Sequence, residues 1–555
     1  MRDLVVGLVA LAAVTAPILA NQPPASAEAD GGAVTLTGEV RIEALDGAVL
    51  DIDDARTVHG SLRLDTAGRI VNDVAMEEYV AGVAEMPSRW PLEALKAQAV
   101  AARTYAWWSA EHAAHDAADI CATTACQVYA GAGVVADDGD RWAEAVAATR
   151  GEVLVTDDGD PALARYFSTS GGRTYDNQEV FPATGPRPYL VGIDDPYDEV
   201  SPYHRWQVRF TREEFDEVLG AGERLAAVSP VTDVRRVGAV DDHHATIVVT
   251  GGDGVEVEVT ALELRDFVSR VAPARFGERF PSRRSDGLRR LPTTLPSTRY
   301  AVEVTGDEVV FDGQGWGHGV GMGQYGARGR ALEGHDHTEI LAAYYRGLQP
   351  TTHDGVPERI DVHLDDVGRE FTVRADAPFT ITDADGEVTA AALGRWRFAH
   401  SGAGWQLTPP DGHDAELDLG PTRLLHGGDD PRTPVVVEVA VNKPAELTLQ
   451  VTDADGAEVF TRRVGVVDPG EHAASWEYVD HDGDEVADGT YHLTFQARDA
   501  DRVSDAEVVS VEVVRPAPDT AVPSPVPSVG TWWLVGLLSA AVAAAVVVVL
   551  RKARS

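Results

Sequence analysis

The first residues with the potential for chemistry surround Glu85, which lies in the apolar stretch Val83-Ala-Glu-Met-Pro87. A carboxyl group in such a stretch can lose solvation and stay protonated near neutral pH, as a general acid must. The alternative is a surface or capping carboxylate. Lys96 and Arg103 follow seven residues apart, so we expect them on one helix face, either as solvated charges or as catalytic partners of Glu85.

A glycine-rich segment, 313–327, is the second group. Glycine fills every odd position from 313 to 323, so an extended chain would have one bare face that another group can approach closely. The opposite face would carry Trp316, His318, Val320 and Met322. These side chains are not typical of a flexible linker. The absence of Gly-Lys-Ser/Thr and of a surrounding βαβ unit argues against a nucleotide-binding loop.

The third group is the hydroxyl-rich segment Ser168-Thr-Ser-Gly-Gly172. It would suit the lining of a sugar or peptide site, and an ordinary hairpin turn is an equal alternative. The chain has no Gly-x-Ser-x-Gly motif around it, so a serine hydrolase of that class is not supported.

Cys121 and Cys126 are the only two cysteines, so no disulfide framework holds the chain together. Three states remain open for them. A short-range disulfide is favoured outside the cytoplasm. The second is a zinc site, in which His112 and His115 would complete a Cys2His2 ligand set, and the third is a pair of free thiols.

Periodicity predicts the elements that position these groups. Alternating runs predict strands over 35–75, and helical spacing predicts a helix over 76–112 with Pro91 in a first turn. Strand-like runs dominate from 150 to 310. Further helices are predicted near 261–271 and 336–346. After residue 350 the pattern is all-β, and sandwich-like strands are predicted at 435–441, 445–452, 474–478 and 490–497.

The two ends predict a compartment. Residues 1–27 have the pattern of a secretory signal peptide. A proline-rich linker (516–530) precedes a charge-free run that predicts a transmembrane helix at 531–550. The basic tail 551–555 would then face the cytoplasm. We expect an ectodomain outside the membrane, anchored through its C-terminal helix.

The net charge of −42 excludes most nucleic-acid partners, which need a basic face to neutralise phosphate. A hydrophobic fraction of 44% argues against disorder. The charge is unevenly placed, because residues 351–515 contain 34 acidic and 13 basic residues. The acidity therefore belongs mainly to the C-terminal β modules, where we interpret it as solubilising.

Five motifs in order resemble the SpoIID/LytB family over residues 60–350. They are Glu85-Met-Pro, Glu93-Ala-Leu-Lys-Ala-Gln-Ala-Val-Ala-Ala-Arg-Thr-Tyr105, Cys126-Gln-Val-Tyr-Ala-Gly131, Ser168-Thr-Ser-Gly-Gly172 and Gly315-Trp-Gly-His-Gly-Val-Gly-Met-Gly-Gln-Tyr-Gly-Ala327. Trp476 and the Asp-Gly-Asp run after it resemble the immunoglobulin-like domain of flagellar hook-capping proteins. One departure is Ala125, where the family often carries a histidine that some members use for zinc.

The resemblance implies an α+β ectodomain of SpoIID type, followed by all-β sandwich-like modules and the transmembrane helix. The expected division is an N-terminal β segment (28–60), a SpoIID-like domain (61–350) with a β-rich insertion at about 185–305, a small β region (351–425) and an immunoglobulin-like sandwich (430–515).

The resemblance also implies cell-wall work on peptidoglycan glycan strands. SpoIID members are lytic transglycosylases of strands without stem peptides, and LytB members are enhancers of a peptidoglycan amidase. The implied catalytic residues are Glu85, Lys96 and Arg103. The implied substrate-binding residues are Ser168, Ser170, Gly171, Gly172, Trp316, His318, Gln324 and Tyr325. No cofactor is expected unless Cys121, Cys126, His112 and His115 bind zinc. A non-catalytic amidase enhancer or wall-binding protein is the main alternative, and a glycan-binding adhesin is a third.

Overall fold

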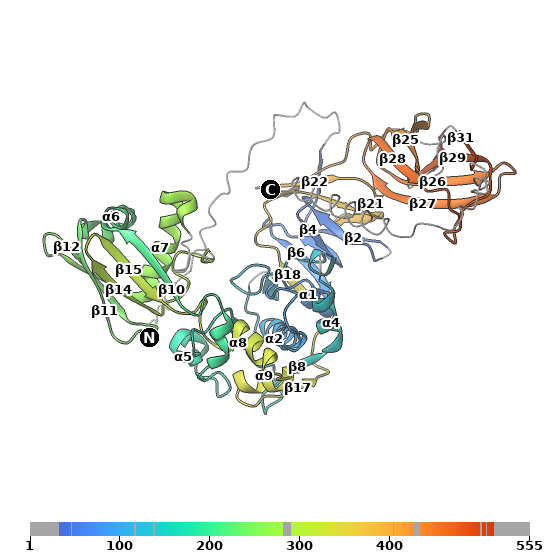
Figure 1. The fold of residues 1–555 in the computed structure, drawn as a ribbon. Coiled ribbons are helices and arrows are strands. Elements are labelled where there is room, and N and C mark those ends of the chain that lie inside the picture. The colour runs from blue at the N-terminus through green and yellow to red at the C-terminus, as the bar shows by residue number, and fades with distance from the viewer. Residues whose placement is uncertain are drawn as a thin grey trace, which may run out of the picture.

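The computed structural model describes residues 33–515, except for 46, 116–117, 137–138, 281–289, 403, 427–432, 500–501 and 507. The predicted signal peptide, linker, transmembrane helix and cytoplasmic tail lie outside these residues. Of the helices that are described, none is both long and apolar enough to cross a membrane. Three hydrophobic cores divide the described chain into three parts (Figure 1).

The first part contains two sheets that share one core. The seven-stranded sheet has the order β21 (Gly386–Ala392), β20 (Phe379–Asp383), β2 (Val40–Ala44), β5 (Ser61–Leu64), β6 (Ile70–Ala75), β18 (Arg359–His363) and β7 (Ile120–Cys121). The six-stranded sheet has the order β1 (Val34–Thr35), β23 (Gly404–Thr408), β22 (Trp396–Ser401), β19 (Glu370–Ala375), β3 (Leu50–Ile52) and β4 (Arg56–Val58).

These sheets correct the expected division into a segment 28–60, a domain 61–350 and a region 351–425. Strand β2 pairs with β20, and β6 pairs with β18, so all three segments contribute to the same sheet. The physical reason is that alternation locates strands but does not determine which strands pair. The first part is therefore built from both flanks of the helical region.

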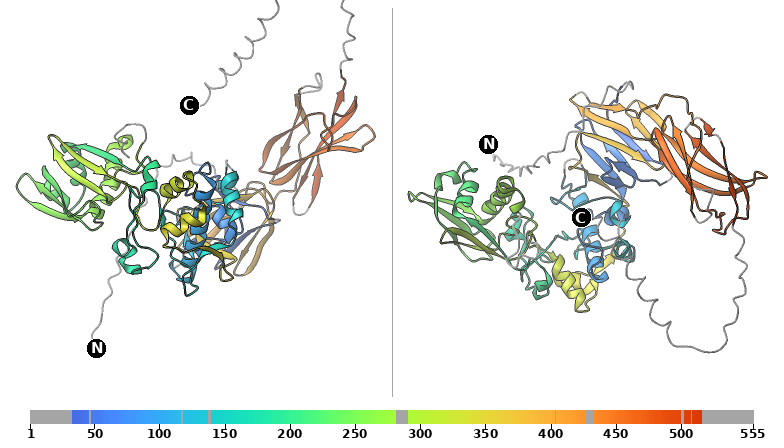
Figure 2. Two further views of the ribbon diagram at one scale, coloured as in Figure 1. Left: turned by 60° about the horizontal axis from the view of Figure 1, so that its bottom comes forward. Right: turned by 45° about the horizontal axis from the view of Figure 1, so that its top comes forward.

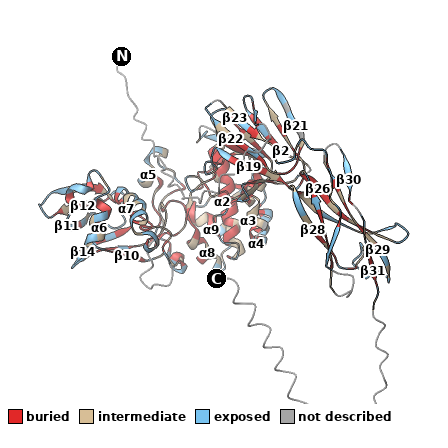
Figure 3. Ribbon diagram, turned by 90° about the horizontal axis from the view of Figure 1, so that it is seen from above, coloured by how far each residue is buried: buried red, intermediate tan, exposed pale blue. Residues whose placement is uncertain are grey.

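Helices lie beside these sheets, and two of the motifs lie on α2 and at the start of α8. Their bounds are α1 (Met76–Ala81), α2 (Leu92–Glu111), α3 (Gly133–Ala136), α4 (Asp140–Ala148), α5 (Asn177–Val180), α8 (Gln324–Leu332) and α9 (His337–Tyr344). Two short sheets, β8 (Glu152–Leu154) with β17 (Pro350–Thr352) and β9 (Tyr166–Phe167) with β16 (Met322–Gly323), connect distant segments. Figure 3 shows α2 buried along most of its length.

The single helix predicted over 76–112 is two helices. Helix α1 ends at Ala81, and α2 begins only after Pro91, which occupies its N-cap position. Pro87 and Pro91 lack the N–H that a continuous helix needs, and each disfavours the helical conformation of the residue before it. The break creates the loop that carries Glu85.

The second part is an insertion with its own core. One sheet has the order β10 (Trp206–Thr211), β15 (Glu308–Gly313) and β14 (Tyr300–Thr305), and the other has β11 (Val231–Val237), β12 (Thr246–Gly251) and β13 (Glu256–Thr260). Helices α6 (Arg212–Leu219) and α7 (Ala261–Phe276) begin with capping boxes. Trp206 pairs with Gly313, so the chain leaves and returns at one place.

The third part is a β-sandwich with a separate core. One sheet contains β24 (Arg423–His426), β25 (Val435–Val441) and β28 (Gly470–Trp476). The other contains β27 (Glu458–Val467), β26 (Ala445–Asp453) and β29 (Gly489–Arg498), with β30 (Val503–Asp505) and β31 (Val509–Val513) both paired to β29. Trp476 is buried against Tyr478 and Tyr491. Figure 2 shows the insertion and the sandwich on opposite sides of the helical region.

Candidate active site

Glu85 lies in the loop between α1 and α2 and is half-buried. Its Oε1 accepts a hydrogen bond of 2.8 Å from the backbone N–H of Val128. Burial raises the pKa of Glu85 above its ordinary value, although the Val128 N–H and the Gln324 amide oppose this rise. The carboxyl group therefore keeps its proton to a higher pH than an exposed glutamate does, as a general acid requires.

Three segments fix the position of this loop. Val83 forms a bridge with Tyr129, and the Ala84 N–H donates to the Val128 carbonyl at 2.9 Å. From the start of α8, Gln324 Nε2 donates to the Glu85 carbonyl at 3.3 Å and to Gln98 Oε1 on α2 at 3.4 Å. Gln324 is thus brought to Glu85, and Gln98 is a neighbour that sequence reasoning did not single out.

The structure does not bring Lys96 and Arg103 to Glu85. Lys96 Nζ pairs with Glu93 at 2.7 Å. Arg103 is fully buried, where its Nε and Nη2 donate to Glu77 at 2.9 and 2.7 Å and its Nη1 donates to the Glu152 carbonyl at 3.0 Å. Two residues along a helix turn the side chain by about 200°, so Lys96 lies across α2 from Gln98.

The catalytic role predicted for the two cations stays a prediction, and the structure gives both of them partners other than Glu85. They do share one face of α2, as their spacing predicts, but that face packs on α1, β8 and α9. Burial alone would raise the pKa of Glu93, yet hydrogen bonds from Lys96 and from the backbone and ring of His337 lower it to about 2. His337 also contacts Glu152 at 3.3 Å. The cations therefore hold elements together.

The Ser168–Gly172 turn is organised by a buried carboxylate that sequence reasoning missed, Asp198. Its oxygens accept the backbone N–H groups of Ser170 and Gly171 at 3.0 and 2.8 Å. Gly171 has a φ of 68°, and a Cβ there would lie 2.8 Å from the Gly315 nitrogen. Ser170 and Gly171 are buried, so they hold the turn in place and do not face solvent. Ser168 and Gly172 are half-buried.

The glycine segment is not an extended strand. Gly315, Gly317, Gly319 and Gly321 all have positive φ, between 78° and 104°. The group that approaches these glycines closely is the protein itself and not a ligand. A Cβ on Gly321, for example, would lie 2.0 Å from the Arg165 carbonyl oxygen. The predicted common face of 316, 318, 320 and 322 is therefore corrected, since each left-handed residue redirects the next side chain.

His318 packs between Phe167 and Phe181, with ring centroids 5.4 and 5.2 Å away. Burial, followed by the charge of Arg165, lowers the pKa of His318 to about 3. Its Nδ1 accepts the Val320 N–H at 3.1 Å. His318 is therefore a neutral ring that shapes the loop.

Aromatic rings form a continuous cluster that leads away from Glu85. Trp90 contacts Tyr325 at 4.7 Å, Tyr325 contacts Tyr203 at 6.2 Å, and Tyr203 contacts Trp316 at 5.1 Å, all between ring centroids. Tyr203, Trp316 and Tyr325 are half-buried. Half-exposed aromatic faces suit stacking on a sugar ring. Trp90 shares the Glu85 loop, a signal that could have found it, whereas Tyr203 follows no motif.

Asp195 is a second carboxyl group with a raised pKa. Burial and then the charge of Asp198 raise its pKa to about 6, against a hydrogen bond from the Tyr344 hydroxyl. Asp195 is fully buried, so a substrate cannot reach it. Glu85 differs because it is only half-buried as a residue, whereas Asp195 has no exposed surface.

Of the three states open to the cysteines, the structure contains the Cys121–Cys126 disulfide. His115 Nε2 lies 3.0 Å from Cys126 Sγ, and these three residues could form a metal cluster by distance. His112 instead lies 2.8 Å from the Trp108 carbonyl and stacks on that indole. Zinc binds thiolates, so the disulfide form does not fit the four-ligand site.

Comparison with known proteins agrees with these motifs. The model of the SpoIID family, described as "Stage II sporulation protein", matches residues 65–155. Stage II sporulation protein D of Bacillus subtilis is 31% identical over 299 residues, which cover 51% of this chain and 76% of that protein. The chain belongs to the SpoIID family. This SpoIID protein also resembles the amidase enhancer of Bacillus subtilis, at 30% identity over 48% of this chain and 39% of that protein.

The sandwich of this SpoIID protein has a separate likeness. Residues 425–501 match the FlgD Ig-like domain. The solved structure of FlgD from P. aeruginosa is 16% identical and covers 17% of this chain and 68% of that chain, with a TM-score of 0.14. The prediction of an immunoglobulin-like module is confirmed by the family match.

Proposed function

We propose that this SpoIID protein is a lytic transglycosylase of peptidoglycan glycan strands and that Glu85 is its general acid and base. The observation that carries the proposal is a half-buried carboxyl group with a raised pKa, held beside half-exposed aromatic rings. Asp195 meets the pKa criterion but is sealed from substrate.

The proposed reaction needs one carboxyl group. Protonated Glu85 gives its proton to the glycosidic oxygen as the bond to C1 of the muramic acid breaks. The 6-hydroxyl of the same sugar then bonds to C1, and the Glu85 carboxylate takes its proton. Ordinary glycosidases use two carboxyl groups because water must attack. Burial, Val128 and Gln324 act on the Glu85 pKa, and no second carboxylate is among these influences in the described chain.

Hydrogen bonding indicates which oxygen carries the proton. The Val128 N–H donates to Oε1 at 2.8 Å, so Oε1 must offer a lone pair there. The acidic proton of Glu85 then belongs on Oε2. The same bond orients the carboxyl group, which supports efficient transfer at a fixed position.

One observation favours the second candidate, a non-catalytic amidase enhancer or wall-binding protein. Lys96 and Arg103 are committed to Glu93 and Glu77, so neither is placed to stabilise charge at Glu85. Binding without cleavage would not need such a cation. The likeness to an amidase enhancer supports this candidate as well.

Denuded glycan strands would separate the two candidates. We expect the purified protein to release fragments with 1,6-anhydromuramyl ends, detected by mass spectrometry, and Glu85→Gln to release none. Lack of cleavage by the wild-type protein, together with stimulation of an added peptidoglycan amidase, would establish the second candidate instead.

A further inference from the structure

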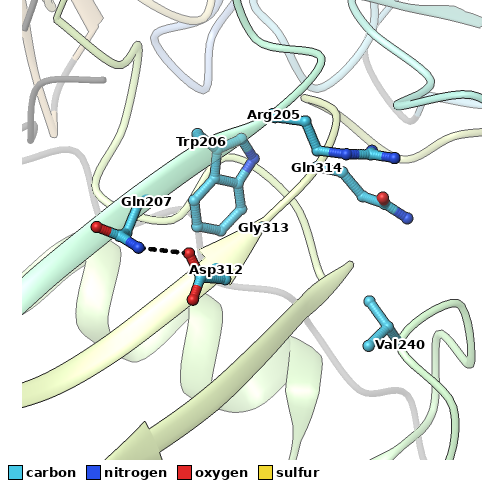
Figure 4. A pocket seen from close by; sticks show the side chains of 7 residues that line it. All are labelled: Arg205, Trp206, Gln207, Val240, Asp312, Gly313 and Gln314. Atoms are coloured by element: carbon cyan, nitrogen blue, oxygen red, sulfur yellow. Dashed lines mark hydrogen bonds between the residues drawn. The ribbon is translucent and has the colours of Figure 1, made fainter. Parts of the chain in front are cut away.

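A pocket of about 300 Å³ lies where the insertion leaves the first part of the molecule. Its lining residues come from the two strands at the root of the insertion, β10 and β15, and from the loops beside them. They are Arg205, Trp206, Gln207, Val240, Asp312, Gly313 and Gln314 (Figure 4). This volume is at the lower end of the range for small-molecule sites.

Arg205 has spare hydrogen-bonding capacity in this pocket. Its Nη1 donates to the Gly171 carbonyl at 3.1 Å and to the His204 carbonyl at 3.3 Å. Within the described chain, its Nε and Nη2 make no hydrogen bond and the guanidinium forms no ion pair. Arginine has five N–H donors in a planar fork that matches a carboxylate. An exposed, unpaired guanidinium is notable in a chain with net charge −42.

The rest of the lining is both polar and apolar. Asp312 Oδ1 accepts from Gln207 at 2.6 Å. In Figure 4 the side chains of Arg205 and Gln314 extend in the same direction, with Val240 across from them. The Trp206 ring lies against Gly313, where a Cβ would be 2.1 Å from it. Sugars present hydroxyl groups at their edges and C–H groups on their faces, so this mixture suits a saccharide.

The pocket is connected to Glu85 by the aromatic cluster. Trp206 Nε1 donates to the Gly315 carbonyl at 2.8 Å, immediately before Trp316 in the chain. Trp316 contacts Tyr203, and Tyr203 contacts Tyr325. Tyr325 follows Gln324, which donates to the Glu85 carbonyl. The half-exposed rings of Tyr325, Tyr203 and Trp316 therefore lie along the protein between Glu85 and the root of the insertion beside Arg205.

We propose that this pocket is a distal subsite for an acidic sugar unit of the same glycan strand, with Arg205 binding its carboxylate. The polymer class rests on the function proposed above. Glycans without stem peptides have free lactyl carboxylates, and a bidentate guanidinium–carboxylate pair recognises such a group more specifically than an ammonium does. Long strands gain affinity from this second contact, and short fragments do not.

The test measures binding of denuded glycan oligomers of increasing length to the full chain carrying Glu85→Gln, by calorimetry, so that no cleavage intervenes. We expect affinity to rise once an oligomer spans both sites. Adding Arg205→Gln lowers the affinity for long oligomers by about tenfold, as expected for loss of a charge-assisted contact. The affinity for short oligomers stays unchanged. Gln314→Glu, which places a carboxylate beside Arg205, gives the same loss if the first variant folds poorly.

Arg235→Gln is the matched control, because it removes the same charge from β11, where Arg235 forms an exposed ion pair with Glu256 and is not among the residues that line the pocket. Long oligomers whose carboxylates have been amidated should bind all forms equally. Equal affinities of the Arg205→Gln and Arg235→Gln proteins at every length overturn the subsite. The proposed function fails by a different result. If the wild-type protein binds long strands through Arg205 but cleaves none of them, the subsite proposal stands and the transglycosylase proposal is wrong.

Discussion

At the scale of single residues, the decisive feature is the difference between Glu85 and Asp195. Burial raises the pKa of both carboxyl groups. Only the half-buried Glu85 can meet a ligand, because Asp195 is sealed beneath the Ser168–Gly172 turn. Accessibility, and not the direction of the pKa shift, therefore identifies the candidate catalytic group.

Gln324→Leu should move the pH dependence of cleavage. The Gln324 amide lowers the Glu85 pKa, so its removal lets burial raise that pKa further. A general acid loses activity as pH rises through its pKa, and the alkaline limb of the kcat/KM profile should thus shift to higher pH. A limb that stays in place or moves to lower pH would contradict this assignment of Glu85. Gln406→Leu, at an exposed position on β23, is the control.

Asp195 should make folding stability pH-dependent. Its folded pKa of about 6 lies above the ordinary value of 3.8, so the folded state binds the proton more tightly. The contribution of Asp195 to stability is then greatest below pH 4 and is lost as pH rises from 4 to 6. Asp195→Asn should remove a loss of roughly 2–3 kcal/mol across this window, as measured by urea unfolding at several pH values. An equally steep pH dependence in the variant would refute this.

At the scale of elements, α2 separates two chemistries on opposite faces. Gln98 faces Gln324 and Glu85, whereas Lys96 and Arg103 face α1, β8 and α9. The seven-residue spacing correctly predicted a shared face for the two cations. It could not reveal which elements pack on that face, because helical periodicity contains no information about distant neighbours.

Arg103→Met should lower the stability of the fold and leave the cleavage activity of the folded protein unchanged. The variant leaves Glu77 without its buried partner, which typically costs about 3–5 kcal/mol. Lys96→Met breaks a half-buried pair with Glu93 and should cost less, about 1 kcal/mol. Thermal unfolding measures both losses. Cleavage per folded molecule should stay near wild type in each variant. A stably folded Arg103→Met protein without activity would support the catalytic role first expected for Arg103.

Many elements were predictable and their assembly was not. The strands at 435–441 and 445–452 follow the predicted alternation, because every second residue is buried. The glycine segment misled an extended-strand interpretation, because its glycines serve left-handed turns against residues 165–175. Tyr203 was missed, since it becomes part of the ring cluster only through the insertion's return to Gly315.

At the scale of the whole molecule, the three hydrophobic cores share no residues, so each part can carry its own function. Glu85 and the helices belong to the first core, and the distal pocket lies at the root of the second. The strongly acidic sandwich has its own core and contacts the first part through a bond from Arg463 to the Asp376 carbonyl. Residues 423–515 contain 20 acidic and 8 basic residues, so the sandwich accounts for −12 of the chain's net charge of −42.

Removal of the sandwich, by a stop after residue 416, should leave cleavage of denuded strands unchanged within about twofold. The reason is that no side chain of the third core contributes to the Glu85 site. Calorimetry should show that one unfolding transition is lost and the others stay close to their original temperatures. A truncated protein that unfolds as a whole, or a large fall in cleavage rate, would show that the parts are coupled.

The central claim is that the muramic acid's own 6-hydroxyl, and not water, completes the reaction begun by Glu85. Cleavage of denuded glycan strands in water enriched in oxygen-18, followed by mass spectrometry, tests it directly. The account predicts anhydro ends without heavy oxygen, formed by the wild-type protein and absent with Glu85→Gln. Reducing ends that carry heavy oxygen would show hydrolysis, and intact strands would show no catalysis at all; either result contradicts the claim.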